Sequence, residues 1–284
     1  MINLTSPCLG DNLYAIPAIN YLSRFRKIDV NILVKDYLPL FESIFWNHKN
    51  IQFYNKITGE TEVDNKVLYR YKTENVIDLW FEAIGIKEYV NTKHKIFPKF
   101  LPSKKWKDSV CLHVTYRVEQ QKLSKEIWNQ IIQIIKDNGY QPILIGNTPP
   151  DPSIITKGSS TQYYVDDIDT NDTVNYINKL SIIETLDLIA GSDYLITPLD
   201  GIHTLSLLTN TPVITTLTYM DYKTFKPYNK GQVFQYIETL CPDKFCLTDF
   251  AKGKTNKLEC KYNFQCISNF GDIDKIPFMF KREL

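Results

Sequence analysis

The chain has 284 residues, which is longer than one ordinary domain and suits two. Apolar residues make up 43% and charged residues 23%, a balance typical of a globular protein and not of a disordered one. The net charge is only +1, so no overall electrostatic field draws the chain to nucleic acid or to a membrane, and any such attraction has to be local.

The first hundred residues alternate strand and helix patterns. Apolar runs predict strands at 2–5, 30–34, 51–54 and 66–71. Helical spacing of apolar residues predicts helices at 12–25 and 73–84, the second capped by Thr73. This alternation predicts a Rossmann-like domain at residues 1–100. No leader sequence and no stretch of ~18 apolar residues is seen, so we expect a cytoplasmic protein, with peripheral contact to the inner membrane left open.

Residues 91–108 interrupt the pattern with two prolines and six lysines, so we place the domain boundary there. A second α/β series follows, in which Ser181 and Glu184 form a capping box. We expect a second Rossmann-like domain at 108–265, and a tail at 266–284 that crosses back to the first. The fold class is therefore α/β, with two Rossmann-like domains facing across a cleft. The predicted elements of this half are strands 110–114, 142–145, 194–196 and 213–217, and helices 124–137, 181–190, 204–208 and 272–280.

The four cysteines nearest the end of the chain are separated by four, thirteen and five residues. Such gaps are wider than those of a tight zinc knuckle, so we interpret the thiols as buried or incidental. Whether they bind anything is left open. The four are Cys241, Cys246, Cys260 and Cys266.

The most informative stretch is DYLITPLDGIHTLSLLTNTPVITTL at 193–217, a strand, a loop, a helix and a second strand. Asp200, Gly201, Ile202 and His203 gather where the first strand ends. Ligands of open α/β sheets bind at that position, and helix N-termini there favour anions. The backbone N–H groups of 201–203 and the His203 side chain are therefore candidates for holding a phosphate. An ordinary structural role for His203 stays open.

A second acidic loop, CLGDNL at 8–13, follows the first predicted strand. Asp11 stands there at the head of a helix, where it could simply cap the helix or act as a general base. The longer segment LGDNLYAIPAINYLSRF resembles the N-terminal signature of glycosyltransferase family 9, the ADP-heptose:lipopolysaccharide heptosyltransferases. The blocks CLHVTYRVEQQKLSKEIWNQIIQII, GYQPILIGN and SIIETLDLIAGSDYLIT with DGIH and TNTPVI resemble further segments of that family, in the same order.

The resemblance implies a GT-B fold in which the first domain holds the acceptor and the second the nucleotide sugar. It also implies inverting transfer without a metal or other cofactor, with Asp11 as the base. The donor residues it suggests are Thr115, Arg117 and Lys122, together with Asp200, Gly201, Ile202 and His203. Two departures from the family pattern stand out. Lys122 is one position from the expected lysine, and Asp200 precedes His203 by three residues where the family has five.

Gly10, Asn12, Lys104 and Lys105 are the acceptor candidates, because the lysine-rich boundary suits an anionic acceptor if it faces the cleft. We expect sugar transfer from a nucleotide-sugar donor to a hydroxyl of lipopolysaccharide core or another bacterial surface glycan or glycolipid. Two alternatives stay open. One is a phage-type enzyme that glycosylates a hydroxymethylated DNA base, for which DNA is the partner. The other is a nucleotide-sugar-binding protein without catalytic activity.

Overall fold

The computed structural model describes residues 1–6, 9–55, 63–64, 75–85, 93, 95–116, 121–148, 163–164, 168–218, 220–229, 232–242, 246, 260, 262 and 265–280. The chain divides into two compact units. The first unit comprises Met1–Phe100 and Tyr222–Gly231, and the second comprises Leu101–Asp221 and Gln232–Leu284. None of the helices in the described ranges is both long and apolar enough to cross a bilayer.

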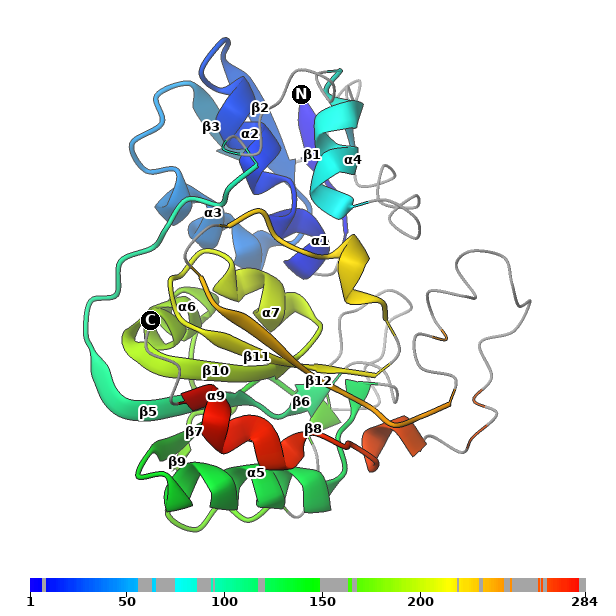
Figure 1. The fold of residues 1–284 in the computed structure, drawn as a ribbon. Helices are drawn as coiled ribbons and strands as arrows, with labels where there is room; N and C mark the ends of the chain where they lie inside the picture. Colours follow the sequence, from blue (N-terminus) through cyan, green and yellow to red (C-terminus); the bar gives the residue numbers. More distant parts are fainter. Residues whose placement is uncertain are drawn as a thin grey trace. The chain divides into compact units, whose positions relative to one another are not determined.

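The first unit is built on a parallel sheet with the strand order β3-β2-β1-β4 (Figure 1). The chain moves outward from β1 to β3 and then returns to place β4 on the other side of β1. The direction of winding therefore reverses between β1 and β4, and ligands of such sheets bind near this switch point. The strands are β1 Ile2–Leu4, β2 Ile28–Ile32, β3 Ile51–Tyr54 and β4 Val63–Asp64.

The helices of the first unit differ from the prediction in two regions, because no helix was expected at residues 35–44 and the first expected helix is divided. The single helix expected at 12–25 is two helices, α1 Leu9–Leu13 and α2 Ile16–Leu22. Pro17 lies in the first turn of α2, where its missing N–H costs no intrahelical hydrogen bond, so the second helix begins there. Asn75 caps α4 by accepting a hydrogen bond from the Ile77 N–H, whereas the expected cap Thr73 and strand 66–71 lie outside the described residues. The other helices are η1 Lys35–Tyr37, α3 Leu38–Ile44 and α4 Val76–Ala83.

The second unit contains a parallel sheet with the order β12-β11-β10-β5-β7-β9. If these six strands are numbered 1 to 6 along the chain, their order across the sheet is 6-5-4-1-2-3. This is the order of a doubly wound Rossmann sheet, and the switch point of the sheet lies between β5 and β10. The α/β class with Rossmann-like sheets is confirmed. The strands are β5 Trp106–His113, β7 Gln141–Ile145, β9 Val174–Asn175, β10 Ser192–Pro198, β11 Val213–Leu217 and β12 Phe234–Glu238, and a separate antiparallel pair joins β6 Thr115–Tyr116 to β8 Tyr163–Tyr164.

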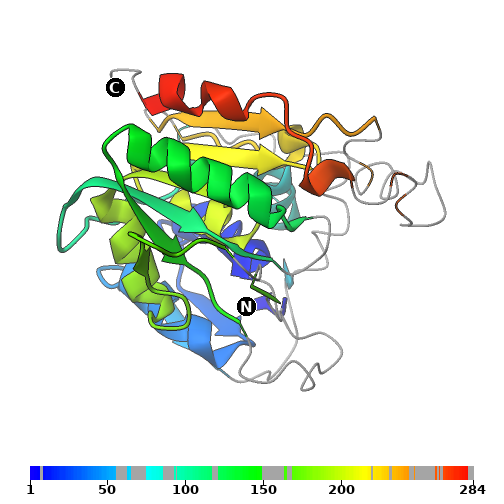
Figure 2. The same ribbon diagram turned by 90° about the horizontal axis from the view of Figure 1, so that it is seen from below.

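Helices cover both faces of this sheet (Figures 1 and 2). α5 (Lys125–Asp137) and α9 (Ile276–Phe280) lie on one face, and α6 (Ile182–Gly191) and α7 (Gly201–Ser206) lie on the other. The face under α5 and α9 holds a continuous apolar core that includes the fully buried Trp128. The predicted capping box of α6 is confirmed, since the Ser181 hydroxyl and the Glu184 carboxylate each accept from the other residue's backbone N–H.

The described part of the tail, residues 265–280, belongs to the second unit, and the crossing of the tail back to the first unit stays a prediction. η8 (Ile273–Lys275) and α9 contribute Ile273 and Phe280 to the core of the second unit, and the Tyr194 hydroxyl donates to the Phe280 carbonyl over 2.6 Å. Residues 222–231 belong to the first unit, because Tyr228 hydrogen-bonds Asp78 over 2.7 Å. This segment begins with η6 (Tyr222–Thr224).

Candidate active site

The acidic segment of the first unit lies in α1, the first helix after β1. The Asp11 carboxylate accepts a hydrogen bond of 2.7 Å from the Ser6 hydroxyl and stays partly exposed. The neighbouring Asn12 is completely buried and donates from its amide to the Ser6 carbonyl over 2.9 Å. Gly10 is buried as well. The segment therefore presents the Asp11 carboxylate beside the switch point, while Asn12 supports it from inside and does not offer its side chain to an acceptor.

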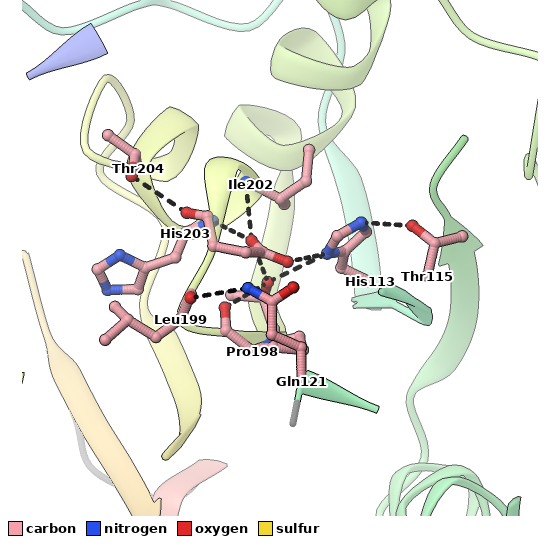
Figure 3. Close-up of polar contacts among 10 residues, drawn as sticks. His113, Thr115, Gln121, Pro198, Leu199, Ile202, His203 and Thr204 are labelled. Atoms are coloured by element: carbon pink, nitrogen blue, oxygen red, sulfur yellow. Dashed lines mark hydrogen bonds and ion pairs between the residues drawn. The ribbon is translucent and has the colours of Figure 1, made fainter. Parts of the chain in front are cut away.

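The corresponding place in the second unit holds a buried polar cluster (Figure 3). His113, the last residue of β5, forms an ion-pair contact of 2.8 Å between its Nδ1 and the Asp200 carboxylate. The other ring nitrogen lies 2.7 Å from the Thr115 hydroxyl. Thr197, on β10, reaches Asp200 over 3.4 Å. The cluster joins the carboxyl ends of β5 and β10, the two strands that flank the switch point.

Asp200 also caps α7. One carboxylate oxygen accepts from the backbone N–H groups of Ile202 over 2.8 Å and His203 over 3.1 Å. Burial by itself raises the pKa of this carboxyl, but the attraction and hydrogen bond of His113 and these two backbone donors outweigh burial, so the pKa of Asp200 lies below its usual value. Asp200 is therefore an anion that already occupies the helix start. Two of the three N–H groups expected to cradle a phosphate, those of Ile202 and His203, are bonded to it.

His203 lies elsewhere than expected. Its side chain is completely buried, and neither ring nitrogen has a hydrogen-bond partner within the described ranges. The ring points away from the cluster (Figure 3) and packs near Phe234, with ring centroids 5.9 Å apart. Burial lowers the pKa of His203 to about 4, although the nearby Asp200 charge acts in the opposite direction. The histidine is therefore neutral at pH 7 and not positioned to donate to a phosphate.

Thr115 and Lys122 lie at the same edge of the second sheet. Thr115 is buried within the His113 cluster, and Gly146 at the end of β7 approaches it so closely that any larger residue would collide with its side chain. The Lys122 ammonium lies 5.3 Å from the centre of the Tyr116 ring and is partly exposed, so it is available to an anion at this edge. Arg117 lies outside the described residues.

The two boundary lysines are separated from this cluster. Lys104 and Lys105 are exposed and precede β5, whose eight residues lead from them to His113 at the other end of the strand. They therefore lie at the amino edge of the second sheet, opposite the candidate site, and they belong to the second unit rather than to the expected acceptor domain. Lys104 packs over the Trp106 ring at 4.0 Å, which gives it a structural contact there.

His113 is the site residue that the sequence analysis missed. It closes a strand that was predicted, and it stands two positions before the predicted Thr115. Because carboxyl ends of parallel strands meet at one edge, a histidine at that position and an aspartate after a neighbouring strand can pair. The strand order that makes β5 and β10 neighbours was the missing information.

The similarity of this chain to known proteins is detected in its structure and not in its sequence. No protein-family model matches the sequence, and no curated protein is detectably similar to it. The crystal structure of a family 9 glycosyltransferase from Veillonella parvula superposes with a TM-score of 0.60 over 97% of this chain and 94% of its own, at 12% identity. The fold is that of the family 9 glycosyltransferases.

Two further structures from E. coli agree with this fold. The iron-containing, dodecameric glycosyltransferase TibC has a TM-score of 0.69 over 99% of this chain and 75% of its own, at 12% identity. The heptosyltransferase WaaC, solved with ADP-2-deoxy-2-fluoro heptose, has a TM-score of 0.52 over 89% of this chain and 99% of its own, at 14% identity. The family 9 fold thus accounts for both units of the chain.

Proposed function

We propose that the chain is an inverting glycosyltransferase that moves a sugar from a nucleotide-sugar donor to a hydroxyl group of an anionic bacterial surface glycan, such as lipopolysaccharide core. The proposal is supported above all by Asp11, a partly exposed carboxylate in α1, the helix that follows β1 beside the switch point of a sheet in a family 9 fold. A glycosyltransferase of this type needs one positioned carboxylate beside the acceptor hydroxyl.

In the proposed reaction the Asp11 carboxylate takes the proton of the acceptor hydroxyl. The acceptor oxygen attacks C1 of the donor sugar from the side opposite the diphosphate. The new C1–O bond forms while the bond from C1 to the diphosphate oxygen breaks, and the nucleoside diphosphate leaves with that electron pair. The configuration at C1 is inverted, and Ser6 orients the carboxylate through its hydrogen bond of 2.7 Å.

The second unit is the proposed donor side. Lys122, with Arg117, supplies positive charge for the leaving diphosphate, and no step of the proposed reaction passes through a metal ion. Asp200 takes a different role from the one first expected: bonded to His113 and to the start of α7, it fixes the loop after β10 against which the donor would lie. Thr115 supports this loop by its contact with His113.

The acceptor assignment rests on the structural neighbours. One neighbour, from E. coli, is an ADP-heptose lipopolysaccharide heptosyltransferase, and we carry this acceptor class over to the present chain as part of the proposal. Gly10 and Asn12 shape the Asp11 segment on the proposed acceptor side. Lys104 and Lys105, at the opposite edge of the second sheet, are assigned no contact with the sugar at the donor site.

The proposal is tested by donor binding and by product stereochemistry. The full chain is screened for thermal stabilisation by ADP-, UDP-, GDP- and CMP-sugars, because a ligand that binds only the folded state raises Tm. With the donor so identified and core oligosaccharide as acceptor, NMR of the product should show the inverted anomeric configuration. Retention of configuration would overturn the mechanism, and the absence of stabilisation by any nucleotide sugar would overturn the function.

A parallel assay with duplex DNA distinguishes a DNA acceptor from a glycan acceptor. Binding to DNA through its phosphates weakens steeply as salt is raised, whereas recognition of sugar hydroxyls does not. Transfer to hydroxymethylated DNA, together with no transfer to the oligosaccharide, would replace the glycan acceptor with DNA and leave the donor chemistry in place.

A further inference from the structure

Two loops at the amino edge of the first sheet expose large aromatic side chains. Parallel strands begin at the same edge of a sheet, so the loop from α2 into β2 and the loop from α3 into β3 lie beside each other (Figure 1). Phe25, in the first loop, is 68% exposed, and Trp46, in the second, is 79% exposed. Because removing such side chains from water is favourable, a pair of them at one edge indicates a contact surface.

Hydrogen bonds hold the two loops against each other. The Asn50 side chain donates to the Ser23 carbonyl over 2.9 Å, and the Ile28 N–H donates to the Asn50 carbonyl over 2.7 Å. The Ser23 hydroxyl also lies 3.5 Å from Nδ1 of His48. The two exposed aromatic side chains are therefore presented together and not on two independent segments.

The same loops carry a local excess of positive charge. The segments SRFRK at 23–27 and WNHKN at 46–50 contain no Asp or Glu, and the nearest acids along the chain are Asp29 and Glu42. Four cations are thus set against two carboxylates at this edge, although the whole chain has a net charge of only +1. The four cations, all exposed, are Arg24, Arg26, Lys27 and Lys49.

We infer that residues 24–27 and 46–49, the amino-edge surface, dock on the surface of an anionic lipid bilayer. Trp and Phe side chains insert at the boundary between lipid headgroups and acyl chains. Arg and Lys side chains lay their aliphatic stems along apolar surface and keep their charged ends at the anionic headgroups. The two loops therefore offer a matching group to each layer of a bilayer surface.

Other partners fit the amino-edge surface less well. Single-stranded nucleic acid is bound along a groove in which successive bases stack on aromatic rings, whereas Phe25 and Trp46 stand on separate loops with most of each side chain exposed. A second copy of the chain would meet this surface with the same surface in a two-fold contact, which sets like charges against one another. The charge and the exposed aromatic pair together favour the lipid surface.

The amino-edge surface is separate from the proposed catalytic residue. Asp11 lies in α1, which follows β1 on the carboxyl side of the same sheet. A strand of five residues such as β2 spans about 16 Å, and the two features are at opposite ends of the strands. Lipid docking is therefore independent of the proposed sugar transfer, and changes in the amino-edge surface should leave the binding of a nucleotide sugar intact.

The test mixes the full chain with vesicles of phosphatidylcholine that contain about a quarter phosphatidylglycerol. Flotation should recover the chain with these vesicles at low salt, and much less of it with pure phosphatidylcholine or at about 0.5 M salt. Brominated acyl chains should quench the emission of Trp46, since Trp80 and Trp128 are fully buried and Trp106 is only partly exposed. Trp46→Phe should lose this quenching and keep most of the binding.

Paired substitutions separate the apolar from the electrostatic contribution. Phe25→Ser with Trp46→Ser should lower the vesicle partition coefficient by about tenfold or more. Arg24→Gln with Lys27→Gln should lower it by about twentyfold, at roughly fivefold for each charge. The matched control is Leu33→Ser with Lys35→Gln, an exposed apolar residue and an exposed cation beyond the carboxyl end of β2, which should bind as the unmodified chain does.

Several outcomes would overturn the lipid surface. These are no binding to anionic vesicles, binding that survives both paired substitutions, or an equal loss in the control pair. Binding of single-stranded DNA but not of vesicles, or a dimer that Trp46→Ser dissociates, would give the surface to another partner and also overturn the proposal. If Phe25→Ser does not fold, because its ring lies 5.1 Å from that of Tyr21, Trp46→Ser and the charge pair decide.

Discussion

Each unit has an aspartate in the segment that follows a strand beside the switch point of its sheet, and the surroundings of the two aspartates differ. Asp11 follows β1 and Asp200 follows β10, and both strands border the switch point of a parallel sheet. Asp11 is partly exposed and accepts from Ser6. Asp200 is nearly buried and accepts from His113 and from two backbone N–H groups. In both units the fold places a carboxylate near the edge of the sheet where ligands of such sheets bind. Burial and hydrogen bonding then decide whether the carboxylate is available to exchange a proton or is engaged in fixing a loop.

The largest expected effect is on catalysis by Asp11. We expect Asp11→Asn to lower kcat for sugar transfer by about a thousandfold, because general bases contribute about 10²–10⁴. Donor affinity and Tm should stay close to those of the unmodified chain. Asp29→Asn, exposed on β2 of the same unit, is the control and should retain full activity. Undiminished transfer by Asp11→Asn would remove Asp11 from the mechanism, and a chain with no activity to lose would favour the non-catalytic sugar-nucleotide binder.

The second effect is on stability. Asp200→Ala leaves His113 buried without its carboxylate and leaves the start of α7 uncapped. Breaking a buried pair in this way costs about 3–5 kcal/mol of the free energy of unfolding, measured by urea denaturation. Asp137→Ala, exposed on α5, should change the same quantity by less than about 0.5 kcal/mol. Equal stability of the two variants would show that the His113–Asp200 contact does not form in solution.

The third effect concerns pH and His203. Its pKa is about 4 in the folded state and about 6.5 when unfolded, so between these values the unfolded chain binds more protons. Stability is therefore lost as pH falls from 6.5 toward 4, by about 2 kcal/mol at pH 5. His203→Leu should lack this part of the pH dependence. The free energy of unfolding is measured by urea denaturation at pH 7 and pH 5. If it changes between the two pH values by the same amount in His203→Leu and in the unmodified chain, His203 is not buried as a neutral ring.

The smallest expected effect is that of Ser6, which we expect to orient the proposed base Asp11 without acting as the base itself. Ser6→Ala removes the hydrogen bond to Asp11, and we expect kcat to fall by tenfold or less and stability by about 1 kcal/mol. Ser6→Thr restores a hydroxyl and should recover most of the rate. A loss in Ser6→Ala as large as that of Asp11→Asn would mean that the serine takes part in the chemistry.

The sequence sufficed for features that depend on neighbouring residues. Ser181 and Glu184 are three positions apart and form the predicted capping box. Asp200 was expected in the loop after β10, but the helix was expected to begin at Thr204, whereas α7 begins at Gly201 with Asp200 as its cap. It did not reveal His113 as a partner of Asp200, because their contact depends on the strand order. The burial of His203 was equally hidden, since a histidine beside an aspartate in a loop reads as polar until the packing of α7 is known. The roles of Asp11 and Lys122 stay predictions.

The assignment of residues 222–231 to the first unit has a consequence for the design of expression fragments. Three peptide connections join the units, after residues 100, 221 and 231, so neither unit is encoded by one uninterrupted stretch. An expression fragment ending at residue 100 would lack the Tyr228 hydroxyl that bonds Asp78 and the Lys226 carbonyl that bonds Asn75. Exchange of the second unit between related chains would therefore need three junctions, two of which flank this decapeptide, rather than a single fusion junction.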